Sequence, residues 1–208
     1  MKIGVVSGNV VSTINHPFFD GRRLMICDLV TPDGESNGYT IAVDTVDAGV
    51  GDTVLVIGAG AVGCLHCQLA KAEGASRVIL SDINAERLDL IKELSGAELI
   101  INSSTEDLEA QIKEETSGQG VGKVIVACSS GVAQEQALRV VAKRGTVSMF
   151  GFTHKEWPWI KFDSNDCHYR EFFVTGAFAY SRKQFKMALD LLARGVVKTE
   201  QLNTHVFT

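Results

Sequence analysis

The pattern of apolar and polar residues changes near residue 50. Before that point, short apolar runs are separated by turn residues, most clearly by Pro-Asp-Gly at positions 32–34. Proline sets φ to about −65° and glycine accepts positive φ, so this triplet between apolar runs favours a tight turn. The apolar runs lie at Ile3–Val6, Val10–Ile14, Leu24–Val30 and Tyr39–Val43. Residues 1–50 are therefore predicted to form a small antiparallel β segment.

After residue 50, short β-branched runs alternate with amphipathic stretches of helical period. The predicted strands are Thr53–Ile57, Arg77–Ser81, Glu98–Ile101, Lys123–Ala127, Thr146–Phe150 and Phe172–Ala177. The predicted helices are Val62–Glu73, Ala85–Leu94, Glu106–Glu115, Val132–Ala142 and Arg182–Ala193. Such alternation implies right-handed crossovers and a parallel sheet with helices on both faces. The predicted fold class is α/β, a doubly wound six-stranded Rossmann sheet over residues 51–208.

Residues that stabilise helix ends support these boundaries. Caps are predicted at Asn84, at Ser104 with Asp107, and at Ser181 with Gln184, which has capping-box spacing. Glycines that suit the residue after a helix are Gly74, Gly96, Gly145 and Gly195.

A glycine-rich motif, Gly58-Ala59-Gly60-Ala61-Val62-Gly63, separates the first of these strands from the first helix. In this context the motif predicts a dinucleotide site. Gly58 makes the tight turn, Gly60 lets the backbone approach a pyrophosphate, and Gly63 permits close packing of helix on strand. Ala61 and Val62 lie at the N-terminus of the predicted helix, where free N–H groups and the helix dipole favour an anion.

Asp82 stands at the end of the second strand, where a carboxylate can accept hydrogen bonds from the ribose hydroxyls. Its charge would repel a 2′-phosphate, so NAD is predicted in preference to NADP. The alternative is that the glycines only form a turn and Asp82 only begins a loop. The motif also assigns Thr53–Ile57 to the parallel sheet, because a strand in the centre of such a sheet cannot close a separate barrel.

Further candidates follow the later strands. Cys128, Ser129, Phe150, Gly151 and Phe152 are predicted at the carboxyl edge of the sheet, where ligands bind in open α/β folds. Every strand of such a sheet ends in a loop at that edge, so these residues have two alternative roles, contact with a ligand or simple connection of strand to helix.

The other polar clusters in the sequence do not match a known set of catalytic residues. The His168–Glu171 segment has a structural role or a ligand contact as alternatives, with the structural role favoured. Tyr169 and Tyr180 have no lysine four residues downstream, so the Tyr/Lys pair of short-chain dehydrogenases is missing. Cys64, His66 and Cys67 fall inside a helix, where core packing is favoured over metal binding.

Composition narrows the function classes. The chain has 208 residues, of which 45% are hydrophobic, with a net charge of −5. That acidity argues against a general nucleic-acid binder. No apolar run reaches the length of a membrane span, and the N-terminus lacks the apolar core of a signal peptide, so a cytoplasmic location is expected. The five cysteines are expected to be reduced thiols.

From Gly51 onward the chain resembles the coenzyme domain of zinc-dependent medium-chain alcohol dehydrogenases, nearest to the polyol and threonine dehydrogenase branch. The matching segments are GDTVLVIGAGAVG, HCQLAKAEGASRVILSDINAERL, VIVACSS, ALRVVAKRGTVSMFG, HYREFFVTGAFAY and LLARG. The resemblance implies that Asp82 and Arg87 serve the adenosine ribose and that Met149–Phe152 lies beside the nicotinamide. It also implies a dimer through edge pairing of Phe172–Ala177. The family carries its catalytic zinc in a barrel-like domain whose motifs this sequence lacks, so neither catalytic residues nor zinc are expected here.

The first 57 residues are similar to the pentameric vertex proteins of bacterial microcompartment shells. The resemblance rests on MKIGVVSGNVVSTINHP, RRLMICDLVTPDGESNG and AVDTVDAGVGDTVLV. It implies a pentamer and a location at a microcompartment. The later strands that complete that family's barrel are not found, so the barrel is expected to be incomplete.

Three hypotheses follow. The first is an NAD-binding domain of an alcohol or polyol dehydrogenase-like oxidoreductase without its catalytic domain. The second is a non-enzymatic shell-associated protein whose nucleotide-binding fold is vestigial or regulatory. The third concerns origin: two genes joined at GDTVLV, a segment that suits both families.

Overall fold

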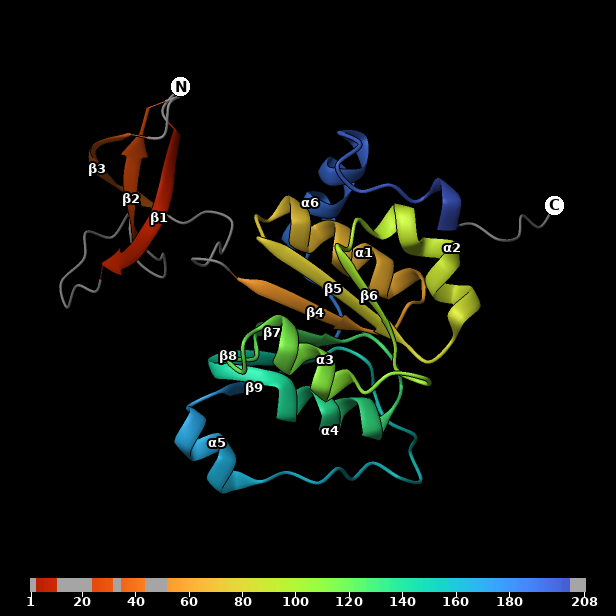
Figure 1. The fold of residues 1–208 in the computed structure, drawn as a ribbon. Helices are drawn as coiled ribbons and strands as arrows, with labels where there is room; N and C mark the ends of the chain where they lie inside the picture. The colour runs from red at the N-terminus through yellow and green to blue at the C-terminus, as the bar shows by residue number, and fades with distance from the viewer. Residues whose placement is uncertain (1–2, 11–23, 32–34, 44–51, 203–208) are drawn as a thin grey trace. The chain divides into compact units, whose positions relative to one another are not determined.

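The computed structural model describes residues 3–10, 24–31, 35–43 and 52–202 (Figure 1). The chain divides into two compact units, Met1–Gly51 and Asp52–Thr208.

The first unit is a three-stranded antiparallel sheet in the order β1-β2-β3. Its strands are β1 (Ile3–Val10), β2 (Leu24–Val30) and β3 (Ser36–Val43). The predicted antiparallel character is confirmed, but β1 continues to Val10 where the sequence indicated two separate runs. The rest of the predicted run to Ile14, and the Pro-Asp-Gly turn, lie outside the described residues. On either side of that turn, the Thr31 amide donates to the Glu35 carbonyl at 2.9 Å.

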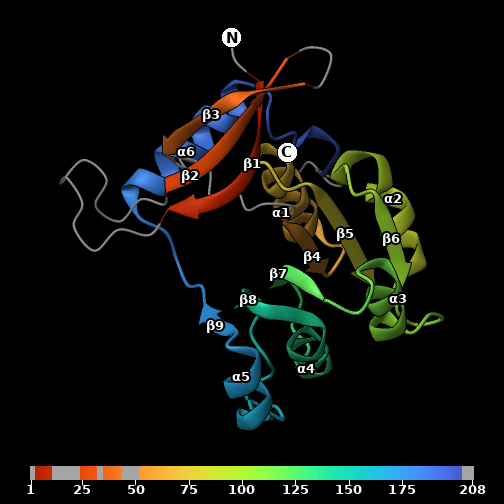
Figure 2. The same ribbon diagram turned by 60° about the vertical axis from the view of Figure 1, so that its left-hand side comes forward.

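The second unit contains a six-stranded sheet in the order β6-β5-β4-β7-β8-β9, and every neighbouring pair is parallel (Figures 1 and 2). Its strands are β4 (Thr53–Ile57), β5 (Arg77–Asp82), β6 (Leu99–Asn102), β7 (Val121–Val126), β8 (Val141–Met149) and β9 (Phe173–Gly176). Its helices are α1 (Ala61–Ala72), α2 (Ala85–Ser95), α3 (Leu108–Glu115), α4 (Gly131–Val140), α5 (Ser164–Arg170) and α6 (Arg182–Ala193), followed by a 3₁₀ turn at Glu200–Leu202. The predicted doubly wound Rossmann fold is confirmed.

Strand β4 lies in the centre of this sheet, between β5 and β7. The chain winds outward to β6 and then returns to β7 beside β4, so the strand order reverses between β4 and β7. In open α/β sheets, ligands bind at such a reversal, outside the carboxyl ends of the strands. The segment TVLVI is therefore a strand of the second unit, as its glycine motif predicted.

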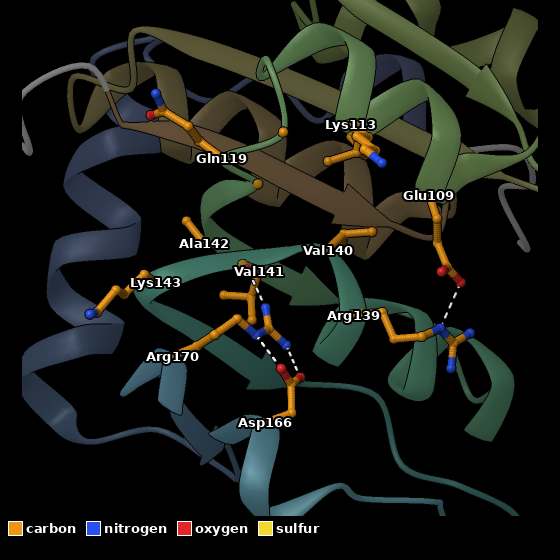
Figure 3. Close-up of a pocket in the computed structure, with 13 residues that line it drawn as sticks. Glu109, Lys113, Gln119, Arg139, Val140, Val141, Ala142, Lys143, Asp166 and Arg170 are labelled. Carbon is orange, nitrogen blue, oxygen red and sulfur yellow. Dashed lines mark hydrogen bonds and ion pairs between the residues drawn. The ribbon is translucent and has the colours of Figure 1, made fainter. Parts of the chain in front are cut away.

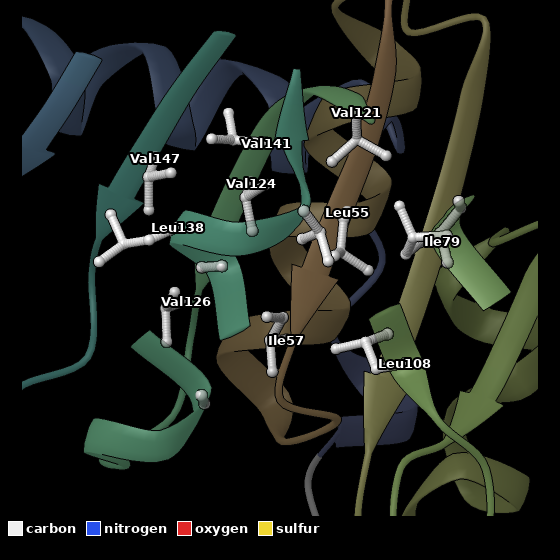
Figure 4. Close-up of a cluster of buried hydrophobic side chains, with 14 of the residues drawn as sticks. Leu55, Ile57, Ile79, Leu108, Val121, Val124, Val126, Leu138, Val141 and Val147 are labelled. Carbon is white, nitrogen blue, oxygen red and sulfur yellow. The ribbon is translucent and has the colours of Figure 1, made fainter. Parts of the chain in front are cut away.

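The alternation of side chains along β4 divides the core into two layers. Leu55 and Ile57 join a cluster with residues of α3, α4, β7 and β8 (Figure 4). Val54 and Val56 face the opposite side, where they pack in a cluster that includes Cys64 and Cys67 of α1. Because both faces of β4 are covered, the strand is apolar at every position from Val54 to Ile57.

Several helix ends match their predictions. The Asn84 side chain accepts a hydrogen bond from the Arg87 amide at 3.0 Å, and Ser181 with Gln184 forms a capping box. Gly96 ends α2 in the left-handed region at φ 67°. Ser104 does not cap α3, because that helix begins at Leu108 and Asp107 accepts from its first amides.

Two predictions around β8 are wrong. Helix α4 ends at Val140 and β8 begins at the next residue, so the predicted helix to Ala142 is too long. Gly145 lies inside β8 and ends no helix. A Cβ there would come within 2.6 Å of Val141 Cγ2 and 2.8 Å of the Gly122 carbonyl oxygen, so close packing of β8 on β7 requires the glycine.

Helix α5 was not predicted, because its seven residues form a polar stretch without an apolar stripe. Its stability comes from Arg170, whose guanidinium donates to the Asp166 carboxylate and to the carbonyls of Leu138 and Val141. The same group lies 4.7 Å from the Phe172 ring centre. These hydrogen bonds hold the pKa of the Asp166 carboxyl below its usual value. In this structure the side chain of Arg170 joins α5 to the end of α4 and the start of β8.

The substitution Arg170→Met is expected to lower the free energy of unfolding by about 2–4 kcal/mol, because two carbonyls and a carboxylate lose their donor. A matched control is Arg194→Met, which removes an exposed pair with Asp190 at the same i,i+4 spacing. Such surface pairs contribute at most about 1 kcal/mol. Urea unfolding of both variants measures the difference, and equal losses would contradict the structural role of Arg170.

Candidate nucleotide-binding site

The glycine-rich loop connects β4 to α1 at the carboxyl edge of the sheet. Gly58 has φ 119°, and a Cβ there would meet Ala127 and Cys128 at 3.1 Å. A Cβ on Gly63 would lie 1.7 Å from the Gly58 carbonyl oxygen. Both glycines are therefore required by backbone packing, which agrees with the roles that the motif predicts for them.

Gly60 is different, because the space around its Cβ position is empty to 4 Å. It is the N-cap of α1, and no side chain caps the helix there. The helices α2 to α6 each have a side-chain cap, from Asn84, Asp107, Ser130, Asp163 and Ser181 respectively. Ala61 and Val62 at the start of α1 are exposed. This helix therefore presents uncapped N–H groups beside open space, which is the arrangement that binds anions.

Asp82 is brought directly to this loop. Its Oδ2 accepts from the Ala59 amide at 2.6 Å, and its Oδ1 accepts from the Asn84 amide at 2.8 Å. The residue is 7% exposed. A carboxylate offers about four acceptor positions on its two oxygens, so two remain after these bonds. Asp82 thus fixes the loop and keeps the capacity to accept hydrogen bonds from a ligand.

The loops after β7 and β8 meet the glycine-rich loop at Cys128. A Cβ on Gly151 would lie 2.2 Å from the Cys128 carbonyl oxygen, and Cys128 also borders Gly58. Burial and the nearby Asp82 charge raise the pKa of the Cys128 thiol. The carboxyl ends of β4, β5, β7 and β8 therefore converge, as predicted for the switch point.

The remaining predicted residues lie at the margins of this edge. Ser129 is exposed, and Phe150 and Phe152 are 43% and 76% exposed. Arg87 is exposed on the first turn of α2, and its guanidinium makes no ion pair within the described part of the chain.

Sequence reasoning missed two residues that support the loop after β8. Gln134 of α4 is buried and donates from Nε2 to the Gly151 carbonyl at 3.0 Å. The His66 ring packs edge-on against Phe150, with centroids 4.5 Å apart, and burial lowers the pKa of its imidazole. Both contacts join segments far apart in sequence, and no local pattern indicated them.

Cys64 and Cys67 have no exposed surface, and burial together with the neighbouring Cys64 raises the pKa of the Cys67 thiol to about 12. Thiolate is the form that binds metals, so these side chains are core residues. Within residues 3–10, 24–31, 35–43 and 52–202, no three His, Cys, Asp or Glu side chains gather as a metal site. None of the helices in those ranges has the length and apolar character needed to cross a membrane.

The model of the zinc-binding dehydrogenase family matches residues 61–194. That span begins at Ala61, the first residue of α1, and ends at Arg194, the residue after α6. The chain belongs to the zinc-binding dehydrogenase family.

The chain is also similar in sequence to individual members of this family. The chain is 30% identical over 158 residues to an uncharacterised zinc-type alcohol dehydrogenase-like protein, YdjL, of Escherichia coli, covering 74% of this chain and 43% of that protein. It is 33% identical over 173 residues to the probable D-xylulose reductase A of Aspergillus niger, covering 80% and 48%. The chain thus spans less than half the length of these relatives.

Solved structures agree with the fold. Benzyl alcohol dehydrogenase from Acinetobacter calcoaceticus superposes with a TM-score of 0.68 at 30% identity, over 76% of this chain and 44% of that one. An alcohol dehydrogenase (rspB) from Escherichia coli CFT073, solved with NADH, gives 0.64 at 28% identity, over 72% and 43%. The chain corresponds to the nucleotide-binding part of such dehydrogenases.

A second family model, for ethanolamine utilisation protein EutN and carboxysome proteins, matches residues 1–83. This match extends beyond the 57 residues in which the sequence resemblance was found. It overlaps the dehydrogenase match over residues 61–83, which form α1 and β5 of the parallel sheet.

The substitution Gly63→Ala is expected to lower the free energy of unfolding by about 3 kcal/mol or more, because its methyl group would collide with the Gly58 carbonyl. Gly60→Ala is the matched control, with free space and an expected change within about 1 kcal/mol. Denaturant unfolding of both variants checks this expectation. Equal stability of the two alanine variants would show that α1 packs on β4 less closely than described.

Proposed function

We propose that the second unit binds NAD(H) at the carboxyl edge of its sheet, with the pyrophosphate at the start of α1. The observation that carries this proposal is the hydrogen bond from the Ala59 amide to Asp82, which sets a carboxylate beside an uncapped, glycine-lined helix terminus. The pyrophosphate accepts from the free amides at Gly60–Val62, while the adenosine ribose bonds to Asp82. A solved relative that contains NADH supports this choice of coenzyme.

Asp82 selects NAD over NADP in this proposal. A 2′-phosphate would bring negative charge to a carboxylate that is nearly buried and already fixed by two backbone amides. Like charges at such close range disfavour binding, whereas ribose hydroxyls donate to the free positions of the carboxylate. Arg87 lies exposed on the adjoining turn and contacts the adenosine ribose from the solvent side.

The nicotinamide end lies over the loops after β7 and β8. Cys128 and Ser129 border it on one side, and Phe150, Gly151 and Phe152 on the other. Gln134 fixes the Gly151 carbonyl, so this loop is held before any ligand arrives. A bound nicotinamide supplies hydride exchange, and the residues of this chain position it and exclude water.

The whole enzyme's reaction is proposed to be the oxidation of an alcohol or polyol. Support comes from relatives named as alcohol dehydrogenases and xylulose reductases. Those relatives are about twice as long, and in this proposal the proton and metal chemistry is supplied by a region that corresponds to the part of the relatives outside the matched span. The described unit alone is proposed to bind coenzyme without turnover.

Titration calorimetry with NADH tests the coenzyme site. Gly60→Ala is expected to weaken binding at least about tenfold, because its methyl group occupies the space through which the pyrophosphate approaches. Lys92→Ala is the control, since Lys92 is exposed on the last turn of α2, at the end of that helix away from the carboxyl edge of the sheet. Absence of heat at about millimolar NADH would overturn the proposal, as would equal affinity of Gly60→Ala and wild type.

Strand β9 is proposed to form a dimer by pairing with its copy in a second chain. It lies at the end of the sheet order and pairs on one side with β8. Phe173 and Val174 are 63% and 44% exposed, and Phe178 beyond the strand is fully exposed. An exposed apolar edge strand is a template for pairing with another chain, and a twofold axis closes such a pair.

The substitution Val174→Lys is expected to raise the dimer dissociation constant at least about tenfold, because two like charges would meet near the axis. Leu90→Lys, on exposed α2, is the control and is expected to leave the dimer unchanged. Light scattering at matched concentrations measures the mass. A monomeric wild type, or an unchanged Val174→Lys dimer, would contradict edge pairing.

A second candidate function is favoured by the match of residues 1–83 to the EutN and carboxysome model. In that proposal residues 1–50 form a separate module that docks at a microcompartment shell, and residues 51–208 form the NAD-binding domain. The protein would then be placed at a microcompartment within the cytoplasm. A pentameric mass in the same light-scattering measurement would favour this candidate over the dimer.

A further inference from the structure

Helix α4 connects the two loops that border the proposed nicotinamide position. It begins at Gly131, directly after residues Cys128–Ser130 of the loop that follows β7. One turn later, Gln134 donates from Nε2 to the Gly151 carbonyl, in the loop that follows β8, at 3.0 Å. The backbone amide of Gln134 donates to the Ser130 carbonyl at 3.1 Å. This one residue is therefore hydrogen-bonded to both loops.

The Gly151 peptide is fixed from several sides. Its amide donates to the Val126 carbonyl at 2.7 Å, and a Cβ on it would lie 2.2 Å from the Cys128 carbonyl oxygen. Its carbonyl accepts from Gln134, which is only 7% exposed. A buried carbonyl that loses its donor costs free energy, because water does not reach it to replace the bond. Gln134 therefore sets the orientation of this peptide against the Cys128 loop.

The next residue of α4 holds the far end of the same loop. The Oε1 atom of Glu135 accepts from the Lys161 amide at 2.9 Å. Between the two attachments lie Trp157 and Trp159, which are 75% and 88% exposed. The loop is thus attached to α4 at two points, and the bond from Gln134 is the one beside the Cys128 loop.

The other end of α4 is fixed at the opposite edge of the sheet (Figure 3). Arg139 pairs with Glu109 of α3 at 2.7 Å, and Arg170 donates to the Val141 carbonyl where β8 begins. These bonds lie away from the carboxyl ends of the strands, so they hold α4 whether or not a coenzyme is bound. Gln134 accordingly extends from a helix whose position is already set.

We propose that Gln134 is a positioning residue for the nicotinamide half of the coenzyme, and this inference rests on the proposed NAD(H) site. Its bond holds the Gly151 peptide in place in the free protein, which removes the entropy cost of ordering that loop when nicotinamide binds. The adenosine and pyrophosphate half depends instead on Asp82 and the start of α1, at the ends of β4 and β5. Loss of the Gln134 bond weakens one half of the coenzyme and spares the other.

Calorimetry on the full chain tests this role, with NADH and with ADP-ribose, which lacks the nicotinamide. Gln134→Met keeps the length of the side chain and removes its donor. It is expected to weaken NADH binding about five- to tenfold and ADP-ribose binding less than about twofold.

The matched control is Gln68→Met in α1. Gln68 is also buried, at 9% exposed, and its side chain also bonds to the backbone of a distant residue, Lys198. This variant is expected to lose stability in urea unfolding because those bonds are lost. The ratio of its NADH and ADP-ribose affinities is expected to stay within about twofold of the wild-type ratio.

A second variant, Gln134→Glu, adds a pH profile. When ionised, the introduced carboxylate has no proton to donate and repels the Gly151 carbonyl; when protonated, its O–H donates to that carbonyl. Burial raises the pKa of such a carboxyl. Relative to wild type at each pH, NADH affinity of this variant is expected to rise at least about threefold between about pH 8 and about pH 5.5, with ADP-ribose affinity unchanged. Because protonation restores the bond, this variant provides the test at low pH if Gln134→Met does not fold.

The inference is overturned if Gln134→Met weakens NADH and ADP-ribose equally, or changes neither. It is also overturned if Gln68→Met shifts the ratio of the two affinities as much, or if Gln134→Glu shows the pH profile of wild type. A wild-type protein that binds no NADH would contradict the coenzyme site itself, and this role of Gln134 with it.

Discussion

The carbonyl oxygen of Gly58 occupies the position in which residue 63 would place a side chain, 1.7 Å from an ideal Cβ. That contact sets how closely α1 packs on β4, and β4 is the central strand of the sheet. With α1 in this position, its first amides face the carboxyl edge and the Asp82 carboxylate reaches the Ala59 amide. A side chain at position 63 would move the helix away from the strand and separate these groups.

The nucleotide site depends on hydrogen bonds that cross from one strand end to the next. Gly58 donates to the Ser81 carbonyl at 2.7 Å, Ala127 donates to Ile57 at 2.8 Å, and Gly151 donates to Val126 at 2.7 Å. These bonds continue the sheet ladder into the loops, so the loops are held by the same interaction as the strands. The carboxyl edge of the sheet is therefore held by backbone hydrogen bonds, while Phe150 and Phe152 remain exposed at its margin.

The two family matches overlap on a segment that belongs to the parallel sheet of the second unit. Residues 61–83 belong to both matched spans, and in the structure they form α1 and β5 of the parallel sheet. Strand β4 pairs with parallel neighbours on both sides, which leaves it no edge for a strand of the first unit. Residues 3–10, 24–31 and 35–43 accordingly form a three-stranded sheet of their own.

The sequence alone was sufficient to predict the six strands of the second unit, five of its six helices, the glycine motif and the acid at the end of β5. These features depend on local rules: side-chain period, capping groups, and glycine where the backbone turns or approaches closely. Tertiary structure decided the rest. Helix α5 has no apolar stripe and is held by Arg170, which reaches carbonyls of Leu138 and Val141 about thirty positions earlier in the chain. The contacts of Gln134 with Gly151 and of His66 with Phe150 likewise join residues distant in sequence. No local pattern encodes such contacts, because they exist only after the sheet has brought its strand ends together.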